Sequence, residues 1–284
     1  MKYSPNVLKV RNFLIAYAPK PLVALIVKLK GGGTVFAPKF VKPQSDEKKV
    51  LSAVIAYNKN GAYCIPWSSS YKGPAQKIFR GLQYENETFE YIKNLHLDGD
   101  IIHAGAYFGD SIPALAKGIS SEQKIWSFEP SSENFRAAQI TIQLNGLSNV
   151  HLFRNAIGEK NETKKVLTKN PDTGKALGAT SRIVSSDDSS AEETIEVVTL
   201  DSAIPADRKI SLMHIDVEGY EISALSGAKE LIIRNKPIII IESGVKNEDR
   251  YREFMESIGY EYKEGVERRD YEAGYRNSVF IAKS

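Results

Sequence analysis

The sequence has little cysteine, and this limits how the chain can be crosslinked. Cys64 is the one cysteine among 284 residues, so no disulfide bond can form within the chain. A zinc site built on several thiolates is excluded for the same reason, and the scarcity of cysteine favours a reducing compartment. Because Cys64 lies in an apolar run, we expect it to be a small buried residue.

Long hydrophobic runs are also absent. The most apolar run near the amino terminus covers residues 22–29 and contains Lys28. A helix that spans a bilayer needs about 20 apolar residues. Residues 1–20 lack the compact apolar segment and the cleavage site of a secretory signal. We therefore expect a cytoplasmic protein that attaches at most peripherally to the inner surface of the membrane.

Acidic residues are scarce in the first part of the chain. Residues 1–75 carry a net charge of +10 and the remainder carries −7, which together give +3. Apolar residues recur at helical spacing over residues 7–17, with basic residues between them. Such a helix suits an anionic membrane surface, but the simpler interpretation is that it packs on the body of the protein or on a second copy in a homo-oligomer. No nucleic-acid partner is expected, because few aromatic residues are spaced for stacking.

The order of predicted elements indicates an α/β fold with a doubly wound, mostly parallel sheet. A β-hairpin is predicted from residues 50–57 and 62–67, which flank a turn that ends in glycine. A second, antiparallel hairpin is predicted at the carboxyl end, from residues 260–263 and 279–282. We divide the chain into a basic amino-terminal arm with its hairpin, residues 1–75, and a main domain, residues 76–284. The predicted helices are 85–95, 110–118, 132–144, 222–231 and 250–258, and the predicted strands include 125–128, 150–154, 164–168, 195–200, 212–217 and 238–241.

Two segments between these elements have a simpler interpretation. Residues 170–194 are rich in Ser, Thr, Asp and Gly without sustained periodicity, so we expect an exposed, mobile loop. Asp201 follows a strand and is expected to begin a turn or cap a helix.

The stretch 98–130 predicts strand, glycine-bearing turn, helix, strand and closing acid. Gly105 and Gly109 allow the backbone to approach a ligand closely, and the free amides at the start of the next helix attract a carboxylate or phosphate. Glu129 lies twenty residues after Gly109, where an acid can accept hydrogen bonds from a ribose diol. The stretch therefore predicts a nucleotide-cofactor site, although the glycines could serve only a tight turn.

Polar residues gather at three predicted strand ends: around His103, in the segment 215–220 (IDVEGY) and in the segment 241–244 (IESG). In a doubly wound sheet these strand ends share one edge, where ligands bind. The candidates for acid–base chemistry therefore lie in the second and third segments.

Asp216 is the first candidate for acceptor positioning or general base, with Glu218 close behind. His214 lies two residues before Asp216, hence on the same face of a strand, and suits proton transfer near neutral pH. Asp216 and Glu242 could instead hold a hard divalent cation that acidifies the acceptor. Plainer roles stay open, because Glu218 and Glu221 could cap the next helix and His214 could be an ordinary buried residue.

Several blocks of sequence resemble a known family: GAYFGD, WSFEPSSENF, RNAIGE, VTLD, HIDVEGYE, SGAKELI and KPIIIIE. In this order and spacing they resemble the FkbM-type S-adenosylmethionine-dependent methyltransferases, over about residues 80–284. The resemblance implies a class I methyltransferase, Rossmann-like fold and S-adenosyl-L-methionine as the cofactor. It also implies methylation of a hydroxyl, often on a sugar or secondary metabolite. The expected partner is a small-molecule or glycan acceptor, as in polysaccharide biosynthesis.

The resemblance also assigns cofactor residues. Gly105, Ala106 and Gly109 would line the methionine and sulfonium portion, Glu129 would hold the ribose, and Asn155 with Ala156 would border the adenine. The full predicted cofactor set is His103, Ala104, Gly105, Ala106, Tyr107, Gly109, Asp110, Glu129, Pro130, Asn155 and Ala156.

Two residues depart from the family pattern. The family usually has Asp where this chain has His103, and a protonated His could not replace that charge near the cofactor's ammonium group. Asp110 or Asp100 could compensate for the missing carboxylate. The family often has Lys where this sequence has His214.

The sequence also allows two other functions. The departure at His103 allows a non-catalytic binding module built on the same fold. A nicotinamide-dependent oxidoreductase shares the half-fold but needs G-x-G-x-x-G, whereas this chain offers GAYFG at residues 105–109.

Overall fold

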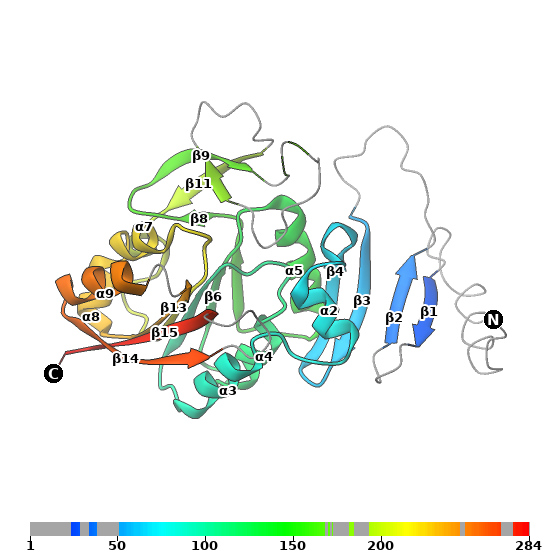
Figure 1. Ribbon diagram of the computed structural model, residues 1–284, viewed down its shortest axis with the longest axis horizontal. Coiled ribbons are helices and arrows are strands. Elements are labelled where there is room, and N and C mark those ends of the chain that lie inside the picture. Colours follow the sequence, from blue (N-terminus) through cyan, green and yellow to red (C-terminus); the bar gives the residue numbers. More distant parts are fainter. Residues whose placement is uncertain are drawn as a thin grey trace.

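The computed structural model describes residues 24–28, 34–38, 51–167, 170, 172, 182–184, 193–244, 248–267 and 275–283. Within these residues the strands form three sheets, one of seven strands and two of four (Figure 1). The basic helix predicted at residues 7–17 lies outside the described residues.

The seven-stranded sheet has the order β14-β15-β13-β12-β5-β6-β7. The strands from β13 to β7 run parallel, and β15 pairs antiparallel with both β13 and β14. This arrangement confirms the doubly wound sheet and the carboxyl-terminal hairpin predicted from the sequence. The strands are β5 (Asp100–Ala104), β6 (Ile125–Phe128), β7 (Val150–Phe153), β12 (Ile210–Ile215), β13 (Ile238–Gly244), β14 (Tyr260–Glu267) and β15 (Tyr275–Ala282).

Helices cover both faces of this sheet. One face, which includes Ile102 and Met213, packs against the helices α6 to α9, and the other, which includes Ile101 and Leu212, packs against α3 and α4. Neighbouring residues of one strand thus enter opposite cores, which explains why the central strands are apolar throughout. The helices are α3 (Asn86–Asn94), α4 (Ile112–Lys117), α6 (Leu200–Ala203), α7 (Glu221–Ser226), α8 (Lys229–Asn235) and α9 (Glu248–Ser257). None of the described helices is both long and apolar enough to cross a bilayer.

The predicted amino-terminal hairpin is present as β3 (Ala53–Asn58) and β4 (Gly61–Pro66). It packs on α5 (Ser132–Leu144), which Figure 1 shows between the hairpin and the seven-stranded sheet. Asn145 ties the two together, because its side chain accepts from Ala62 N at 2.9 Å and donates to Ala62 O at 2.6 Å. Cys64 is buried in this hairpin, as expected, and burial raises the pKa of its thiol to about 11.

Among the elements near this hairpin that the sequence did not predict are two strands and a helix. The strands are β1 (Ala24–Lys28) and β2 (Thr34–Pro38), which extend the hairpin into a four-stranded antiparallel sheet. The helix is α2 (Gly73–Phe79), which has Pro74 in its first turn. Proline at that place is a helix-start signal that the sequence did contain.

The second four-stranded sheet has the order β10-β9-β11-β8 and corrects one expectation. A loop was expected over residues 170–194, but residues 182–184 form a strand that pairs antiparallel with β9. A strand this short has no periodicity of its own, and its pairing depends on the partner strand. The strands are β8 (Ala156–Ile157), β9 (Glu162–Leu167), β10 (Arg182–Val184) and β11 (Glu193–Val198).

The helix predicted over residues 222–231 is in fact two helices, α7 and α8, with a break at Gly227. A Cβ atom at Gly227 would lie 1.9 Å from the carbonyl oxygen of Gly158, so another loop occupies the space beside the break. The carboxylate of Asp201 accepts from the amides of Glu230 and Leu231, at 3.1 and 2.8 Å, at the start of α8. Asp201 therefore caps a helix, as the sequence predicted.

A buried carboxylate fixes the beginning of β5. Asp100 is 2% exposed and accepts from Arg208 Nε at 2.7 Å, from Arg208 Nη2 at 2.6 Å and from Trp126 Nε1 at 2.8 Å. Burial alone would raise the pKa of Asp100, but these bonds outweigh burial and lower it. Asp100 lies at the opposite end of β5 from the glycine loop, so the expectation that it could compensate for His103 is wrong.

We predict that Arg208→Met lowers the free energy of unfolding by about 2 kcal/mol, because it leaves the buried carboxylate of Asp100 without its charged partner. Chemical denaturation of the variant and the wild type measures the difference. Lys209→Met is the matched control, since Lys209 pairs with Asp98 on the surface, where ion pairs contribute little. Equal losses in the two variants would contradict the prediction.

Candidate active site

Three neighbouring strands of the large sheet end at the candidate site. β5, β12 and β13 are parallel, so their carboxyl ends share one edge. The chain passes from β5 to β6 on one side and later returns to β12 on the other, which makes the β5–β12 boundary the topological switch point. Ligands of doubly wound sheets bind at this place. The sequence prediction that the three strand ends meet is therefore confirmed.

The loop after β5 is held against the loop after β12. Gly105 has φ of +93°, and a Cβ atom there would lie 1.9 Å from the carbonyl oxygen of Asp216. Gly109 has φ of +83°, and a Cβ atom there would lie 3.1 Å from Thr141 Cγ2 of α5. Both glycines are thus required by the backbone conformation and by the protein's own packing. This reason differs from the close approach to a ligand expected from the sequence.

Glu129 ties this loop to the end of β6. Its carboxylate accepts from the backbone amides of Tyr107 at 2.8 Å and Ser131 at 2.9 Å, and the side chain is 5% exposed. Burial raises the pKa of Glu129 to about 8, although the bonds from Ser131 and Tyr107 oppose this effect. Ala106 donates to Phe128 O at 2.9 Å, so the strand end and the loop form one backbone-bonded unit.

The two histidines lie in the core beneath this edge. His103 Nδ1 is 2.8 Å from Ser127 Oγ, and His103 Nε2 is 3.0 Å from Ser111 Oγ. Burial, with a smaller effect from His214, lowers the pKa of His103 to about 3, so the ring is neutral at physiological pH. The His214 ring stacks on His103 at 5.6 Å and meets Phe89 of α3 edge-on at 6.2 Å. The catalytic role of His214 and the cofactor role of His103 stay predictions.

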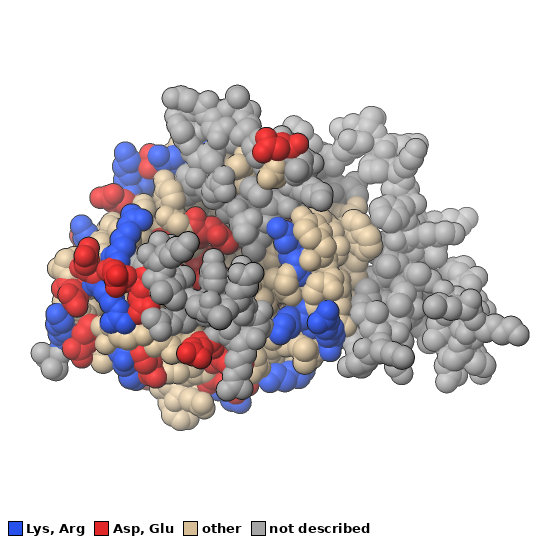
Figure 2. Space-filling model, viewed as in Figure 1, with Lys and Arg blue, Asp and Glu red and all other residues tan. Residues whose placement is uncertain are grey.

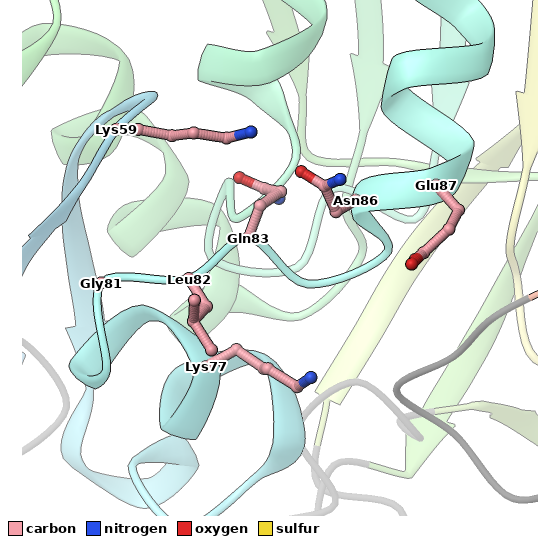
Figure 3. A pocket seen from close by; sticks show the side chains of 7 residues that line it. All are labelled: Lys59, Lys77, Gly81, Leu82, Gln83, Asn86 and Glu87. Carbon is pink, nitrogen blue, oxygen red and sulfur yellow. The ribbon is translucent and has the colours of Figure 1, made fainter. Parts of the chain in front are cut away.

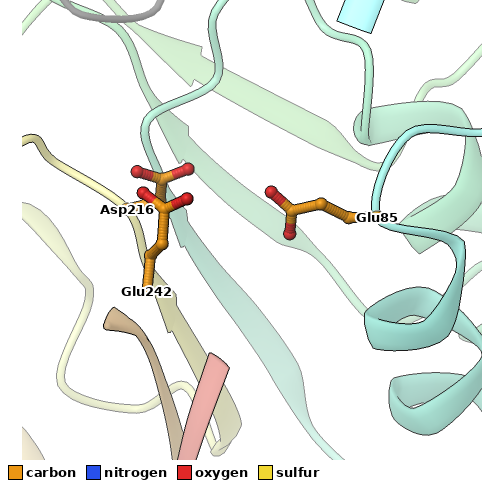
Figure 4. A group of neighbouring side chains, drawn as sticks. All are labelled: Glu85, Asp216 and Glu242. Carbon is orange, nitrogen blue, oxygen red and sulfur yellow. The ribbon is translucent and has the colours of Figure 1, made fainter. Parts of the chain in front are cut away.

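A cluster of three carboxylates stands beside the glycine loop. Each of Glu85, Asp216 and Glu242 offers one oxygen, and these oxygens lie within 4.8 Å of one another; Figure 4 shows Glu85 facing the other two. Burial raises the pKa of Asp216 well above its usual value, and the neighbouring Glu242 raises it further. Asp216 therefore holds a proton more tightly than an exposed aspartate does.

The other predicted residues surround this centre. Glu218 is exposed, with φ of +50°, and Glu221 accepts from Gly219 N at 2.9 Å, an amide that lies before α7, so the capping roles left open for both stay predictions. Asn155 Nδ2 donates to Glu196 O at 3.2 Å, and Ala156 begins β8. Ala104 O accepts from Asp216 N at 3.0 Å, Asp110 O accepts from Gln83 Nε2 at 3.3 Å, and Pro130 directly follows Glu129.

Sequence reasoning missed Glu85 and its neighbour Asn277. Glu85 has φ of +51° and immediately precedes α3, while Asn277 lies opposite Glu242 in the β13–β15 register. Asn277 Nδ2 donates to Glu85 Oε2 at 3.0 Å. A signal for Asn277 was present in the polar run Arg276-Asn277-Ser278 near the start of a strand that is apolar from Val279 onward. Glu85 offered no comparable signal, because an acid at the start of a helix is common.

A separate pocket of about 380 Å³ lies beside the segment that carries Glu85 (Figure 3). None of the predicted site residues lines it, so we do not assign the cofactor to it. Its lining consists of Lys59, Lys77, Gly81, Leu82, Gln83, Asn86 and Glu87.

A protein-family model matches the part of the chain that contains most of the candidate site. The methyltransferase FkbM domain matches residues 103–262, a span that begins at β5 and includes Glu129, Asp216 and Glu242. The chain belongs to this family. It is an S-adenosylmethionine-dependent methyltransferase with a class I fold, and this assignment favours the first of the three functions considered from the sequence. Glu85 and Asn277 lie outside the matched span.

Among curated proteins, no sequence matches this chain. Among solved structures, methyltransferase FkbM from Methylobacillus flagellatus is 17% identical with a TM-score of 0.48, over 75% of this chain and 53% of that one. This chain thus spans about half the length of that protein. A SAM-dependent methyltransferase from Aquifex aeolicus is 15% identical (TM-score 0.42; 70% and 89% covered). TYW2 from M. jannaschii in complex with AdoMet is 12% identical (TM-score 0.44; 86% and 88% covered).

The residues at the switch point fit S-adenosylmethionine. A carboxylate has about four lone-pair sites, so Glu129 can accept from ribose hydroxyls while it keeps its two backbone amides. The loop at residues 104–109 would hold the methionine portion beside it. When bound, the cofactor supplies a methyl group on a positively charged sulfur.

We predict that the stability of the cofactor-free protein falls as the pH rises from about 4.5 to about 8. The pKa of Glu129 is raised in the folded state, so folding favours its protonated form, and that contribution is lost as the pH passes the folded pKa. The loss is at most about 5 kcal/mol, from about 1.4 kcal/mol for each pH unit. Denaturation across this range should show a weaker pH dependence for Glu129→Gln. The same pH dependence of stability in the wild type and in Glu129→Gln would refute the raised pKa of Glu129.

Proposed function

We propose that this methyltransferase transfers the methyl group to a hydroxyl of a sugar, glycan or related metabolite. The observation that carries the proposal is the place of Asp216, whose backbone contacts the glycine loop and whose carboxylate lies beside that of Glu242. A hydroxyl held by this carboxylate would lie beside the methyl donor. A carboxylate is also the group that can accept the hydroxyl's proton.

Methyl transfer to a hydroxyl places two requirements on the protein. It must hold the acceptor oxygen in line with the methyl carbon, and it must remove the hydroxyl proton. The raised pKa of Asp216 makes its carboxylate a stronger base than an exposed aspartate. The acceptor oxygen forms the new C–O bond, the electron pair of the S–C bond stays on sulfur, and the proton passes to the carboxylate.

The charge of the molecule supports an anionic acceptor, such as a phosphorylated sugar. Residues 1–75 carry a net charge of +10, and Figure 2 shows Lys and Arg side chains gathered near α2. Contact of the basic amino-terminal part with an anionic membrane surface, self-association and a cytoplasmic location belong to the same proposal. They rest on the sequence alone.

We predict that Asp216→Asn lowers kcat by about 10²- to 10⁴-fold and leaves the affinity for S-adenosylmethionine nearly unchanged, because Asp216 acts on the acceptor. Release of S-adenosylhomocysteine in the presence of sugars and sugar phosphates measures kcat, and calorimetry measures affinity. Asp98→Asn is the control, since Asp98 precedes the first residue of β5, at the end of the strand away from Asp216. Full turnover in Asp216→Asn, or methylation of an amine but of no hydroxyl, would overturn the proposal.

We predict the reverse pattern for Glu129→Ala. Its removal takes away the acceptor of the ribose hydroxyls, so the affinity for S-adenosylmethionine should fall by about 10- to 100-fold. Titration calorimetry checks this result, with Glu122→Ala on the surface as the matched control. Equal affinity of the wild type and Glu129→Ala would contradict the ribose assignment.

A further inference from the structure

The carboxylates of Glu85, Asp216 and Glu242 come from three separate parts of the chain. Glu85 precedes α3, Asp216 follows β12 and Glu242 lies in β13, yet their oxygens lie within 4.8 Å of one another (Figure 4). Glu85 is 5% exposed, so water screens its charge poorly. Three negative charges this close repel one another strongly unless protons or a cation neutralise them.

The spacing suits a single hard cation. Divalent magnesium, manganese and calcium bind carboxylate oxygens at about 2.0–2.6 Å, so two oxygens on one ion lie at most about 5 Å apart. The three oxygens already meet this limit. Such ions take about six or more ligands, so three carboxylates leave positions open for water or for an acceptor.

Asn277 gives an independent indication that something polar belongs here. Its side chain is 0% exposed, and it lies opposite Glu242 in the β13–β15 register. Nδ2 donates to Glu85 Oε2 at 3.0 Å and to Thr88 Oγ1 at 2.8 Å. Within the described residues, Oδ1 has no hydrogen-bond partner. A buried amide oxygen without a partner is costly, and a cation or its bound water would satisfy it.

We propose that Glu85, Asp216 and Glu242 bind one divalent cation, Mg²⁺ or Mn²⁺, and that Asn277 holds Glu85 in place for it. The inference rests on the proposed function and deepens it: the cation, held by the carboxylates, binds the acceptor. Because three carboxylates would leave ligand positions open, such a cation would favour an acceptor with two neighbouring oxygens, such as the vicinal diol of a sugar.

The cation changes how the hydroxyl loses its proton. An oxygen bound to a divalent cation has a lowered pKa, so its proton can pass to water without a strong base. The ionised oxygen then forms the C–O bond, and the electron pair of the broken S–C bond remains on sulfur. Glu85 becomes a residue of the acceptor site, although it lies outside the span matched by the family.

Titration of the chelator-treated, full-length protein with Mn²⁺, followed by electron paramagnetic resonance, tests the site directly. We expect one saturable site that Mg²⁺ competes for, and at least a tenfold loss of Mn²⁺ affinity in Glu85→Gln. Glu90→Gln is the matched control, since Glu90 lies on the exposed side of α3 and pairs with Lys59 and Lys93. The absence of saturable binding, or equal affinity in Glu85→Gln and the wild type, would overturn the inference.

The melting temperature gives a second measurement that a purely structural role would not produce. With a chelator present, Glu85→Gln should melt above the wild type, because one repelling charge is gone. With millimolar Mn²⁺ this order should reverse, since only the wild type gains from the ion. An order that does not change with Mn²⁺ would count against the site.

Failure of this inference can be told from failure of the proposed function. If hydroxyl methylation continues unchanged with a chelator present, the proposed role of the cation is refuted and the proposed function is not. If the protein binds Mn²⁺ at one saturable site but methylates only amines, the cation site is supported and the hydroxyl acceptor is refuted.

Discussion

The contact between the backbone of Gly105 and the carbonyl of Asp216 is the constraint on which this structure depends. It joins the loops that leave two neighbouring parallel strands at the point where the chain reverses its progress across the sheet. Any side chain at residue 105 would push these loops apart. The contact therefore brings the loop at residues 104–109, which we expect to hold the methyl donor, against Asp216 of the acidic cluster.

The sequence predicted well what depends on local pattern. The helix over 132–144 has the predicted bounds, and the alternation of strands and helices was enough to place the ends of β5, β12 and β13 at one edge of the sheet. Prediction failed where a distant part of the chain decides the outcome. The break at Gly227 is set by the approach of Gly158, and Glu85 joins Asp216 only through tertiary folding. Neither relation leaves a trace in periodicity or spacing.

His103 shows how a departure from a family pattern can be absorbed. The resemblance places an aspartate there, and the histidine carries no charge that could replace it. Instead, both ring nitrogens face hydroxyls, from Ser111 before α4 and Ser127 in β6, and the ring rests on His214. The histidine thus holds the start of α4 and the neighbouring strand together.

The amino-terminal hairpin shares its core with the loop at residues 104–109. Tyr63 and Ile65 of β4 belong to one apolar cluster with Tyr107 and Phe108 of the loop and with α5. The hairpin thus packs beneath the loop at residues 104–109. Substitutions in β4 that change this packing would therefore change the conformation of the loop. The two segments are therefore expected to vary together during evolution, although more than 40 residues, from about 65 to 107, separate them in the chain.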